Sequence, residues 1–486
     1  MSAEIKNIQP SEVWSHFYAL NQVPRGSKKE ERVIAFAKTF GEDLGLETLV
    51  DEVGNVIIRK AATPGMENKK ILTLQSHLDM VHQKNNSTVF NFDEDPIKMF
   101  IEGDWVKADG TTLGADNGMG VAAIMGVLAS KDIPHGPIEA LFTIDEETGM
   151  TGAMGLKANV LTGDILLNLD TEDEGELCIG CAGGVDTTIN MDYIEEPTPE
   201  NSVAYEINIQ GLKGGHSGCD IHLQLGNANI LLSRILWEAA NKFSLRIAAF
   251  EGGSLRNAIP RESYAIVTVP MNNQESFKAF FSDMTKILKF EYKNTEANLV
   301  LELKETTADW VMDLEKQSGI LNSLIACPNG VHKMSDDIEG LVETSSNLAR
   351  VEIKGGHFNC KTLQRSSLES GKWDIANKVN ACFTMINAEV SHGGAYPGWI
   401  PNPKASILKT MKALHNDIFD YEPKVSAVHA GLECGLLGQN YPDMEMISFG
   451  PTIRGAHSPD ERVHIPAVES FWKYLLATLE NAPENN

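Results

Sequence analysis

Seven imidazole and carboxylate side chains are the residues of this sequence best suited to chemistry. They are His77, Asp79, Asp116, Glu146, Glu147, Asp170 and His457. Hydrolysing an amide bond near neutral pH requires an activated water, a polarised carbonyl group and a proton carrier. Two metal ions about 3.5–4 Å apart supply the first two when a carboxylate bridges them. Imidazole and carboxylate ligands without thiolate suit zinc, manganese or cobalt, so the set predicts a two-metal hydrolytic site.

The first three of these residues have distinct expected roles. We expect His77 to bind metal and Asp79 to orient its imidazole, because ligating histidines usually bond such a group through their other ring nitrogen. Asp116 lies between glycines in Leu-Gly-Ala-Asp-Asn-Gly, where the backbone is free to approach closely. That position suits a bridging carboxylate at a helix start, although an ordinary helix N-cap is the alternative.

The remaining candidates follow apolar segments. Glu146 and Glu147 are adjacent, so one is expected to bind metal while the other takes a proton from the attacking water; a solvated acidic turn is the alternative. Asp170 follows another apolar run and is a further ligand or, again, a turn acid. His457, in a turn-rich loop after the apolar run 446–449, is the strongest candidate for the last ligand.

Short apolar runs alternate with helical patterns in the first third of the chain. Strands are predicted at 56–59, 71–75, 138–144 and 165–169, and helices at 11–23, 27–44 and 121–128. This alternation predicts an α/β domain around a mostly parallel sheet. Three of the strands run directly into candidate ligands. Ligands bind beyond the carboxyl ends of strands in such sheets, so these side chains are expected to converge.

The pattern changes after Gly184, where a strand at 203–212, a helix at 227–242 and a strand at 264–269 indicate an inserted α+β domain. We therefore predict a catalytic domain formed by residues 1–186 and 393–486 and an insert at 187–392. Lys-Gly-Gly-His occurs at both 213–216 and 354–357, which suggests an internal duplication of the insert. The turn-rich segment 392–399 is the predicted return linker.

Composition narrows the possible partners and location. The formal net charge is −26, and so acidic a surface repels phosphate, which argues against nucleic acid as a partner. No segment approaches the roughly 20 apolar residues that cross a membrane, and no signal peptide is recognisable. Cys178 and Cys181 form a lone C-x-x-C without the second pair that a structural zinc site needs. A cytoplasmic protein is expected.

The motifs around these residues, in their order along the chain, resemble those of the two-zinc metallopeptidase family that includes carboxypeptidase G, aminoacylase and the dipeptidases. The motifs are Ser76-His-Leu-Asp-Met-Val, Leu113-Gly-Ala-Asp-Asn-Gly-Met-Gly, Thr143-Ile-Asp-Glu-Glu-Thr-Gly, Asn168-Leu-Asp and Gly455-Ala-His-Ser-Pro-Asp-Glu. One departure is Asn117, where many members carry a second acid. It cautions against transferring substrate preferences from the aminoacylase and carboxypeptidase branches.

The resemblance implies a role for each site residue. It implies that one zinc ion is bound by His77, Asp116 and Asp170, and the other by Asp116, Glu147 and His457. Glu146 would be the general base, and Asp79 would tune His77. The insert would act as a lid that often carries the dimer contact, with His216 at the oxyanion and Asn257 and Arg365 at the terminal carboxylate. An arginine fork suits bidentate binding of a carboxylate.

The resemblance to the dipeptidase branch further implies cleavage of unblocked dipeptides, including Xaa-His peptides of the carnosine kind, by a zinc-dependent homodimer. Mn²⁺ or Co²⁺ are possible substitutes for zinc. An N-acyl amino acid deacylase using the same metal site is the close alternative. A non-catalytic metal- or peptide-binding protein and a thiol enzyme using Cys178 and Cys181 are the more distant alternatives.

Overall fold

The computed structural model describes residues 2–485, and the chain forms two compact units. Unit 1 comprises Met1–Gly180, Pro401–Ala427 and Leu432–Asn486, and unit 2 comprises Cys181–Ile400 and Val428–Gly431. The sequence placed the two main boundaries after residues 186 and 392. The divisions lie after Gly180 and Ile400 because strands β9 (Gly183–Asp192) and β21 (Glu389–Tyr396) both belong to the sheet of unit 2.

Unit 1 is built around an eight-stranded sheet whose centre is parallel. Across the sheet the strands are β1 (Glu47–Val50), β2 (Val56–Lys60), β6 (Ile138–Thr143), β3 (Leu72–His77), β7 (Ile165–Asn168), β23 (Glu445–Ser448), β8 (Glu176–Cys181) and β22 (Lys424–Val428). The strands β6, β3, β7 and β23 are parallel, and β1, β2 and β8 pair antiparallel. The predicted α/β fold with a mostly parallel catalytic sheet is confirmed.

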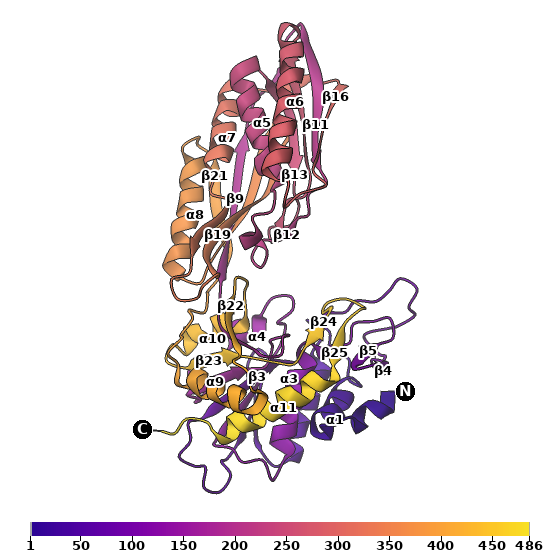
Figure 1. The fold of residues 1–486 in the computed structure, drawn as a ribbon, viewed down its shortest axis with the longest axis vertical. Helices are drawn as coiled ribbons and strands as arrows, with labels where there is room; N and C mark the ends of the chain where they lie inside the picture. Colours follow the sequence, from indigo (N-terminus) through magenta and orange to yellow (C-terminus); the bar gives the residue numbers. More distant parts are fainter. Residues whose placement is uncertain (1, 486) are drawn as a thin grey trace. The chain divides into compact units, whose positions relative to one another are not determined.

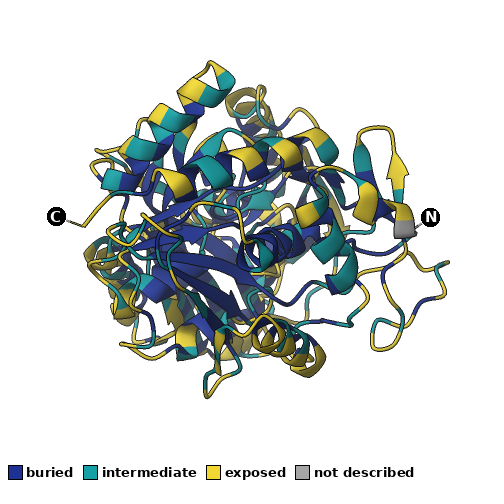
Figure 2. Ribbon diagram, turned by 90° about the horizontal axis from the view of Figure 1, so that it is seen from below, coloured by how far each residue is buried: buried dark blue, intermediate teal, exposed yellow. Residues whose placement is uncertain are grey.

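Helices cover this sheet. They are α1 (Ser11–Leu20), α2 (Glu31–Asp43), α3 (Ala115–Ala129), α4 (Thr151–Gly155), α9 (Ser406–Phe419), α10 (Glu433–Asn440) and α11 (Ile465–Glu480). Strands β3, β6 and β7 are buried along their whole length, as expected for parallel strands covered on both faces. Figure 2 shows these strands as a dark, buried layer inside helices that expose their outer surfaces.

A smaller antiparallel sheet in unit 1 leads into the late loop that carries His457. It consists of β24 (Ile453–Arg454), β25 (Arg462–His464), β5 (Trp105–Ala108) and β4 (Met99–Glu102). Strands β24 and β25 are the two arms of a hairpin, so residues 455–461 form its tip. Pairing of β25 with β5 fixes the base of this hairpin.

Unit 2 contains a nine-stranded antiparallel sheet. Eight strands form a path in the order β16 (Val300–Thr306), β11 (Ser202–Gln210), β15 (Ser263–Pro270), β13 (Arg246–Gly252), β19 (Val342–Lys354), β20 (His357–Ser366), β9 and β21, and β18 (Gly330–Met334) pairs with β19. The helices are α5 (Ala228–Phe243), α6 (Gln274–Glu291), α7 (Leu314–Ala326) and α8 (Glu369–Thr384), which Figure 1 shows beside the strands. One apolar cluster, including Phe250, Phe277 and Phe358, lies between strands and helices.

The order of elements in unit 2 repeats. One half runs β11-α5-β13-β15-α6-β16, and the other runs β9-α7-β19-β20-α8-β21, with the first half inserted after β9. In each half the spatial order of the four strands is fourth, first, third, second, and the two halves meet where β13 pairs with β19. The inserted unit therefore has two topologically equivalent halves.

The structure differs from the sequence prediction in one segment, and the repeated tetrapeptide does not mark the repeat of unit 2. The predicted return linker 392–399 is largely strand: β21 runs to Tyr396 and pairs with β9, with a register shift between Gly393 and Tyr396 that accommodates its glycines. The two Lys-Gly-Gly-His segments are also not equivalent. Lys354–His357 forms the turn of the β19–β20 hairpin, whereas Gly215–His216 is the short strand β12, which pairs with β14 (Ala258–Ile259).

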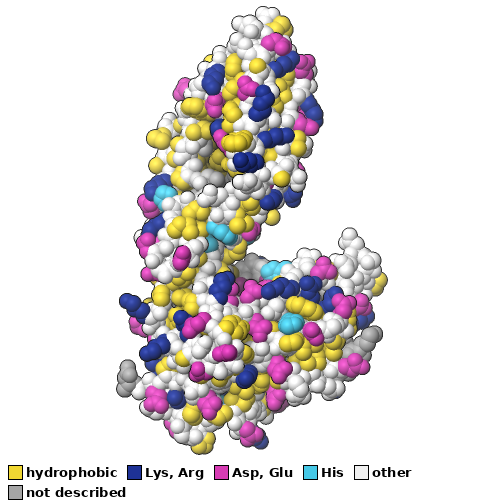
Figure 3. Space-filling model, viewed as in Figure 1, with side chains coloured by type: hydrophobic (Ala, Val, Ile, Leu, Met, Phe, Trp, Pro, Cys, Tyr) yellow, Lys and Arg dark blue, Asp and Glu magenta, His cyan; other side chains and the backbone are white. Residues whose placement is uncertain are grey.

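On the face shown in Figure 3, acidic and basic side chains are interspersed. Within residues 2–485, no helix is long and apolar enough to cross a bilayer. Cys178 and Cys181 are buried at β8.

Candidate metal centre and active site

The carboxyl ends of three neighbouring parallel strands carry most of the candidate site. His77 is the last residue of β3, Glu146 and Glu147 follow β6, and Asp170 follows β7. Because β6, β3 and β7 are adjacent and parallel, their ends lie at one edge of the sheet. Asp116 joins them from the start of α3, where its own backbone is not helical (φ −80°, ψ 113°).

Two groups of ligand atoms share Asp116. In the first, His77 Nε2 lies 3.2 Å from Asp116 Oδ1 and 3.4 Å from Asp170 Oδ1. In the second, His457 Nε2 lies 3.1 Å from Asp116 Oδ2 and 2.8 Å from Glu147 Oε2. The two oxygens of one carboxylate thus face different groups. Within each group the ligand atoms lie within 4.8 Å of one another.

Asp79 holds both His77 and the loop after β6. His77 Nδ1 lies 3.1 Å from the Asp79 carbonyl and 3.4 Å from Asp79 Oδ1, which leaves Nε2 directed at Asp116 and Asp170. The Asp79 carboxylate, fully buried, also accepts hydrogen bonds from the backbone amides of Glu146 (3.1 Å) and Glu147 (3.3 Å) and from Ser27 Oγ (2.8 Å). This is the arrangement by which an acid fixes the ring orientation of a ligating histidine.

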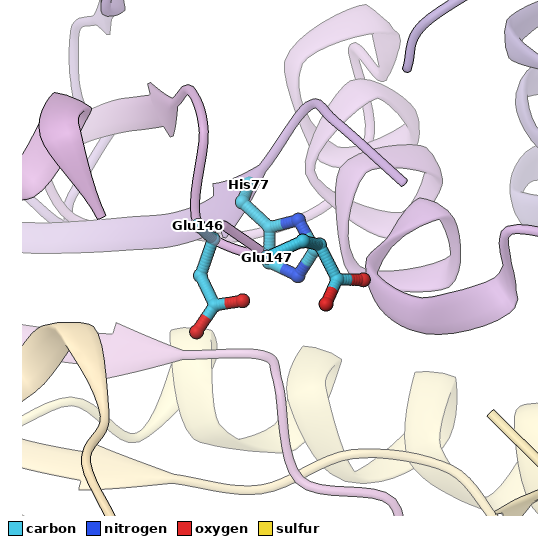
Figure 4. A group of neighbouring side chains, drawn as sticks. All are labelled: His77, Glu146 and Glu147. Carbon is cyan, nitrogen blue, oxygen red and sulfur yellow. The ribbon is translucent and has the colours of Figure 1, made fainter. Parts of the chain in front are cut away.

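Glu146 and Glu147 leave one loop but have different surroundings. Figure 4 shows their carboxylates on either side of the His77 ring in that view, and all three side chains belong to one group of neighbouring ligand atoms. Glu147 contacts His457. Burial raises the pKa of Glu146 well above its usual range, and the negative charges of Asp170, Glu433 and Glu147 raise it further. A carboxyl group with a raised pKa suits a general base that later acts as an acid.

The other charges of the site reflect its excess of carboxylates. Hydrogen bonds to Asp116 and Glu147 raise the pKa of His457 to about 11. Burial opposes protonation of His77, but Asp170 and Asp116 raise its pKa well above the ordinary value. Burial also opposes ionisation of Asp116, yet hydrogen bonds from both histidines lower its pKa. The surrounding carboxylates therefore stabilise a positive charge at the position of each histidine ring.

The residues fit a pair of divalent metal ions. Imidazole and carboxylate donors suit zinc, manganese or cobalt. The Asp116 carboxylate is shared between the two groups, as a bridging ligand must be. Glu147 Oε1 is buried and has no hydrogen-bond partner among the described residues, although buried carboxylate oxygens are normally paired. A bound cation would satisfy it.

The three predicted substrate-binding residues lie together in unit 2. His216 pairs across β12–β14 with Ala258, next to Asn257, whose carbonyl accepts a hydrogen bond from Ser217 N (2.7 Å). A Cβ atom on Gly218 would lie 3.1 Å from both His216 Cε1 and Arg365 Nε, so these two side chains are neighbours. Asn257 is exposed and Arg365 is buried.

Arg365 has the properties of an anion-binding group. Its Nη1 donates to Tyr396 Oη (2.7 Å), and its Nε is buried without a hydrogen-bond partner among the described residues. His216 Nδ1 accepts hydrogen bonds from the amides of Gly218 and Cys219, so the neutral ring carries its proton on Nε2. Burial and the charge of Arg365 lower the pKa of His216.

Three buried charged residues that interact with the site residues were not identified from the sequence. They are Arg25, Glu433 and Glu461, which are at most 2% exposed. Glu461 ends the Gly-Ala-His-Ser-Pro-Asp-Glu motif, and that position was the one signal that could have identified it. Arg25 and Glu433 lie in segments without any metal-ligand pattern.

Comparison with known proteins agrees with this geometry. Residues 73–481 match the family described as peptidase family M20/M25/M40. The chain is 42% identical over 482 residues to the cytosol non-specific dipeptidase of Escherichia coli K12, with 99% of both chains covered. It is similar to the crystal structure of aminoacylhistidine dipeptidase from Vibrio alginolyticus, with 45% identity, 99% of both chains covered and a TM-score of 0.95.

A more distant solved structure shares the fold alone. The aminopeptidase PepT of Bacillus cereus superposes with a TM-score of 0.58 at 16% identity, covering 97% of this chain and 98% of PepT. The resemblance drawn from the sequence motifs, to the metallopeptidases and within them to the aminoacyl-histidine dipeptidases, is confirmed by these matches.

Proposed function

This chain belongs to peptidase family M20/M25/M40, and we propose that it is a two-zinc dipeptidase that hydrolyses the peptide bond of unblocked dipeptides. The observation that carries the proposal is the shared Asp116 carboxylate, with one oxygen facing His77 and the other facing His457. Similarity over 99% of the chain to two proteins named as dipeptidases supports the choice of substrate.

The metal ligands follow from the two groups of side chains. His77, Asp116 and Asp170 would bind one ion, and Asp116, Glu147 and His457 the other. When bound, such a pair of ions polarises the scissile carbonyl and lowers the pKa of a water molecule. Zinc is the metal that we propose, with Mn²⁺ or Co²⁺ as substitutes.

The protein's own groups perform the proton transfers and orient the reactants. Glu146 would take a proton from the attacking water and deliver it to the leaving amine. Asp79 keeps the His77 ring in one tautomer and holds the Glu146 amide, so it fixes ligand and base together. We further propose that His216 donates from Nε2 to the developing oxyanion and that Asn257 and Arg365 bind the terminal carboxylate of the dipeptide.

Replacing the general base tests this mechanism directly. We expect Glu146→Gln to retain two metal ions per chain, because Glu146 is not among the proposed ligands, while kcat falls about 10²–10⁴-fold. Metal content by mass spectrometry of the purified protein and turnover of a free dipeptide are the two measurements. Glu147→Gln is the matched variant from the same loop and should lose metal as well as turnover. Undiminished turnover by Glu146→Gln would remove this residue from the role.

Substrate choice separates the dipeptidase from its close alternative, a deacylase with the same metal site. A dipeptidase is expected to cleave Ala-His and other free dipeptides and to lose most of its kcat/KM when the amine is acetylated. Comparison of Ala-His with N-acetyl-Ala-His and N-acetyl-histidine at matched metal loading measures this. Faster cleavage of the N-acetyl amino acid would establish the deacylase instead.

The remaining parts of the proposal rest on the resemblance and on the composition of the sequence. We propose that Xaa-His peptides are among the substrates, that the enzyme acts in the cytoplasm, and that neither nucleic acid nor a membrane is a partner. We also propose a homodimer, which light scattering would detect as twice the chain mass of 53.2 kDa.

A further inference from the structure

The loop that carries Asp116 is held by a carboxylate from the far end of the chain. Glu461, 2% exposed, accepts four backbone hydrogen bonds: from Leu113 (2.7 Å), Gly114 (3.0 Å), Ala115 (2.7 Å) and Asp116 (3.3 Å). These amides are at the start of α3, where backbone N–H groups have no partner within the helix. The same hairpin tip that supplies His457 thus also binds the backbone of Asp116, the ligand that the two groups share.

Arg25 holds the same loop from the other side. Its guanidinium, 1% exposed, donates to the carbonyl of Gly114 (2.5 Å) and to the carbonyls of Leu78 (3.1 Å) and Asp79 (3.3 Å), which follow His77. One planar fork therefore joins the segment after β3 to the segment before Asp116. Lysine, a point charge on a flexible stem, lacks this fork.

Gly114 lies between the two charged groups. Its amide donates to Glu461 and its carbonyl accepts from Arg25, so a single peptide segment separates a buried cation from a buried anion. Its φ is +70°, and a Cβ atom there would lie 2.4 Å from Arg25 Nη2. Only glycine meets both conditions without displacement of the arginine. Two buried charges are costly unless they are compensated. Here the loop backbone bonds to both groups, and the charge of Glu461 favours the cationic form of Arg25.

We infer that Arg25 and Glu461 are positioning residues that together hold the Asp116 loop, the His77 segment and the His457 hairpin in metal-binding geometry before any metal arrives. The inference rests on the proposed two-metal function and adds two residues that touch neither metal nor substrate. When hydrogen bonds to the backbone already hold the ligands in place, metal binding has less conformational entropy to remove. Groups that orient metal ligands in this way typically contribute about 10- to 100-fold in metal affinity.

Titration of the full-length, chelator-stripped protein with Co²⁺, followed by visible absorption, tests this without any peptide. We expect Glu461→Gln and Arg25→Lys each to weaken Co²⁺ binding about 10- to 100-fold while circular dichroism stays unchanged. If the two residues act as a unit, the double variant should bind Co²⁺ with nearly the same affinity as whichever single variant binds it more weakly.

Glu139→Gln is the matched control. Glu139 is also 2% exposed and accepts backbone hydrogen bonds, from Thr162 (2.8 Å) and Gly163 (3.0 Å), but it lies near the start of β6, away from the ligands. Its replacement should leave Co²⁺ affinity unchanged.

Two results would overturn the inference: wild-type Co²⁺ affinity in folded Glu461→Gln, or equal weakening by Glu139→Gln. If Glu461→Gln does not fold, the Co²⁺ affinity of Arg25→Lys, compared with wild type and with Glu139→Gln, tests the inference instead. The inference and the proposed function fail separately, because loss of Co²⁺ affinity in these variants is independent of whether the wild-type enzyme cleaves dipeptides.

Discussion

At the scale of single residues, the centre has more buried carboxylates than its two histidines can neutralise. Burial raises the pKa values of Glu146, Glu147 and Asp170. Asp116 stays ionised because two imidazoles donate to it. Two divalent cations would add four positive charges where the protein supplies two, so metal binding would allow the remaining acids to ionise. The excess of buried carboxylates therefore makes the centre a favourable place for divalent cations.

The two carboxylate oxygens of the buried residue Glu433 have different surroundings. One oxygen accepts hydrogen bonds from Gln75 Nε2 (2.6 Å) and Thr143 Oγ1 (2.8 Å), whereas Oε1 is buried without a hydrogen-bond partner among the described residues. Burial raises the pKa of Glu433 to about 8. In an unfolded chain this carboxyl group would release its proton near pH 4.5. Between pH 4.5 and 8 the folded state therefore keeps a proton that the unfolded state has lost. Stability from Glu433 is therefore present at low pH and is lost as the pH rises from about 4.5 to 8.

Glu433→Gln should remove this pH dependence, because glutamine stays neutral. In metal-free protein, the free energy of unfolding of the variant minus that of wild type should be larger at pH 8.5 than at pH 5, by on the order of 2–4 kcal/mol, so the variant gains stability relative to wild type at the higher pH. Urea unfolding at the two pH values measures it.

Glu445→Gln is the control for the Glu433 prediction. Hydrogen bonds from Ile407 N and Ser406 Oγ outweigh burial and lower the pKa of Glu445, so its variant should lose stability at the higher pH. An equal difference at both pH values for Glu433→Gln would show that Glu433 is already ionised in the folded protein.

At the scale of elements, the sequence predicted what depends on side-chain pattern. The buried strands β3, β6 and β7 are rich in apolar residues, and candidate ligands stand at or soon after their carboxyl ends, so the sequence predicted both the strands and the site. The structure brings His77, Asp116, Glu147, Asp170 and His457 together, while their catalytic roles stay predictions. His457 was the least evident of these, because its position depends on the β24–β25 hairpin, whose arms are only two and three residues long.

Contacts made through the backbone were not predictable. Glu461 binds four amides and Arg25 binds three carbonyls, and neither contact requires a particular side chain in the partner segment. The segment 392–399 was misassigned because glycines indicate a turn, whereas an edge strand with a register shift also tolerates them. The equivalent halves of unit 2 follow from strand order rather than from the recurring Lys-Gly-Gly-His.

At the scale of the whole molecule, the two units divide the chemistry unequally. Among residues 2–485, every group of three or more side chains with ligand atoms close enough to bind a metal lies in unit 1. Unit 2 has its own apolar core and its own sheet. Metal binding should therefore stabilise unit 1 selectively, since a ligand stabilises the state that binds it, by about 2.7 kcal/mol at 100 times Kd.

Hydrogen exchange followed by mass spectrometry measures this stabilisation segment by segment. Adding Zn²⁺ to chelator-stripped protein should slow exchange in the five segments that carry the proposed ligands: 76–80, 113–118, 145–150, 168–172 and 455–461. Peptides from β19 and β20 should exchange at an unchanged rate, because their amides are already paired within the sheet of unit 2. Asp116→Asn, which weakens the one ligand common to both ions, should abolish most of the protection. Equal slowing in β19 and β20 would mean that the metal ions act on unit 2 as well, and the centre would then require residues beyond those of unit 1.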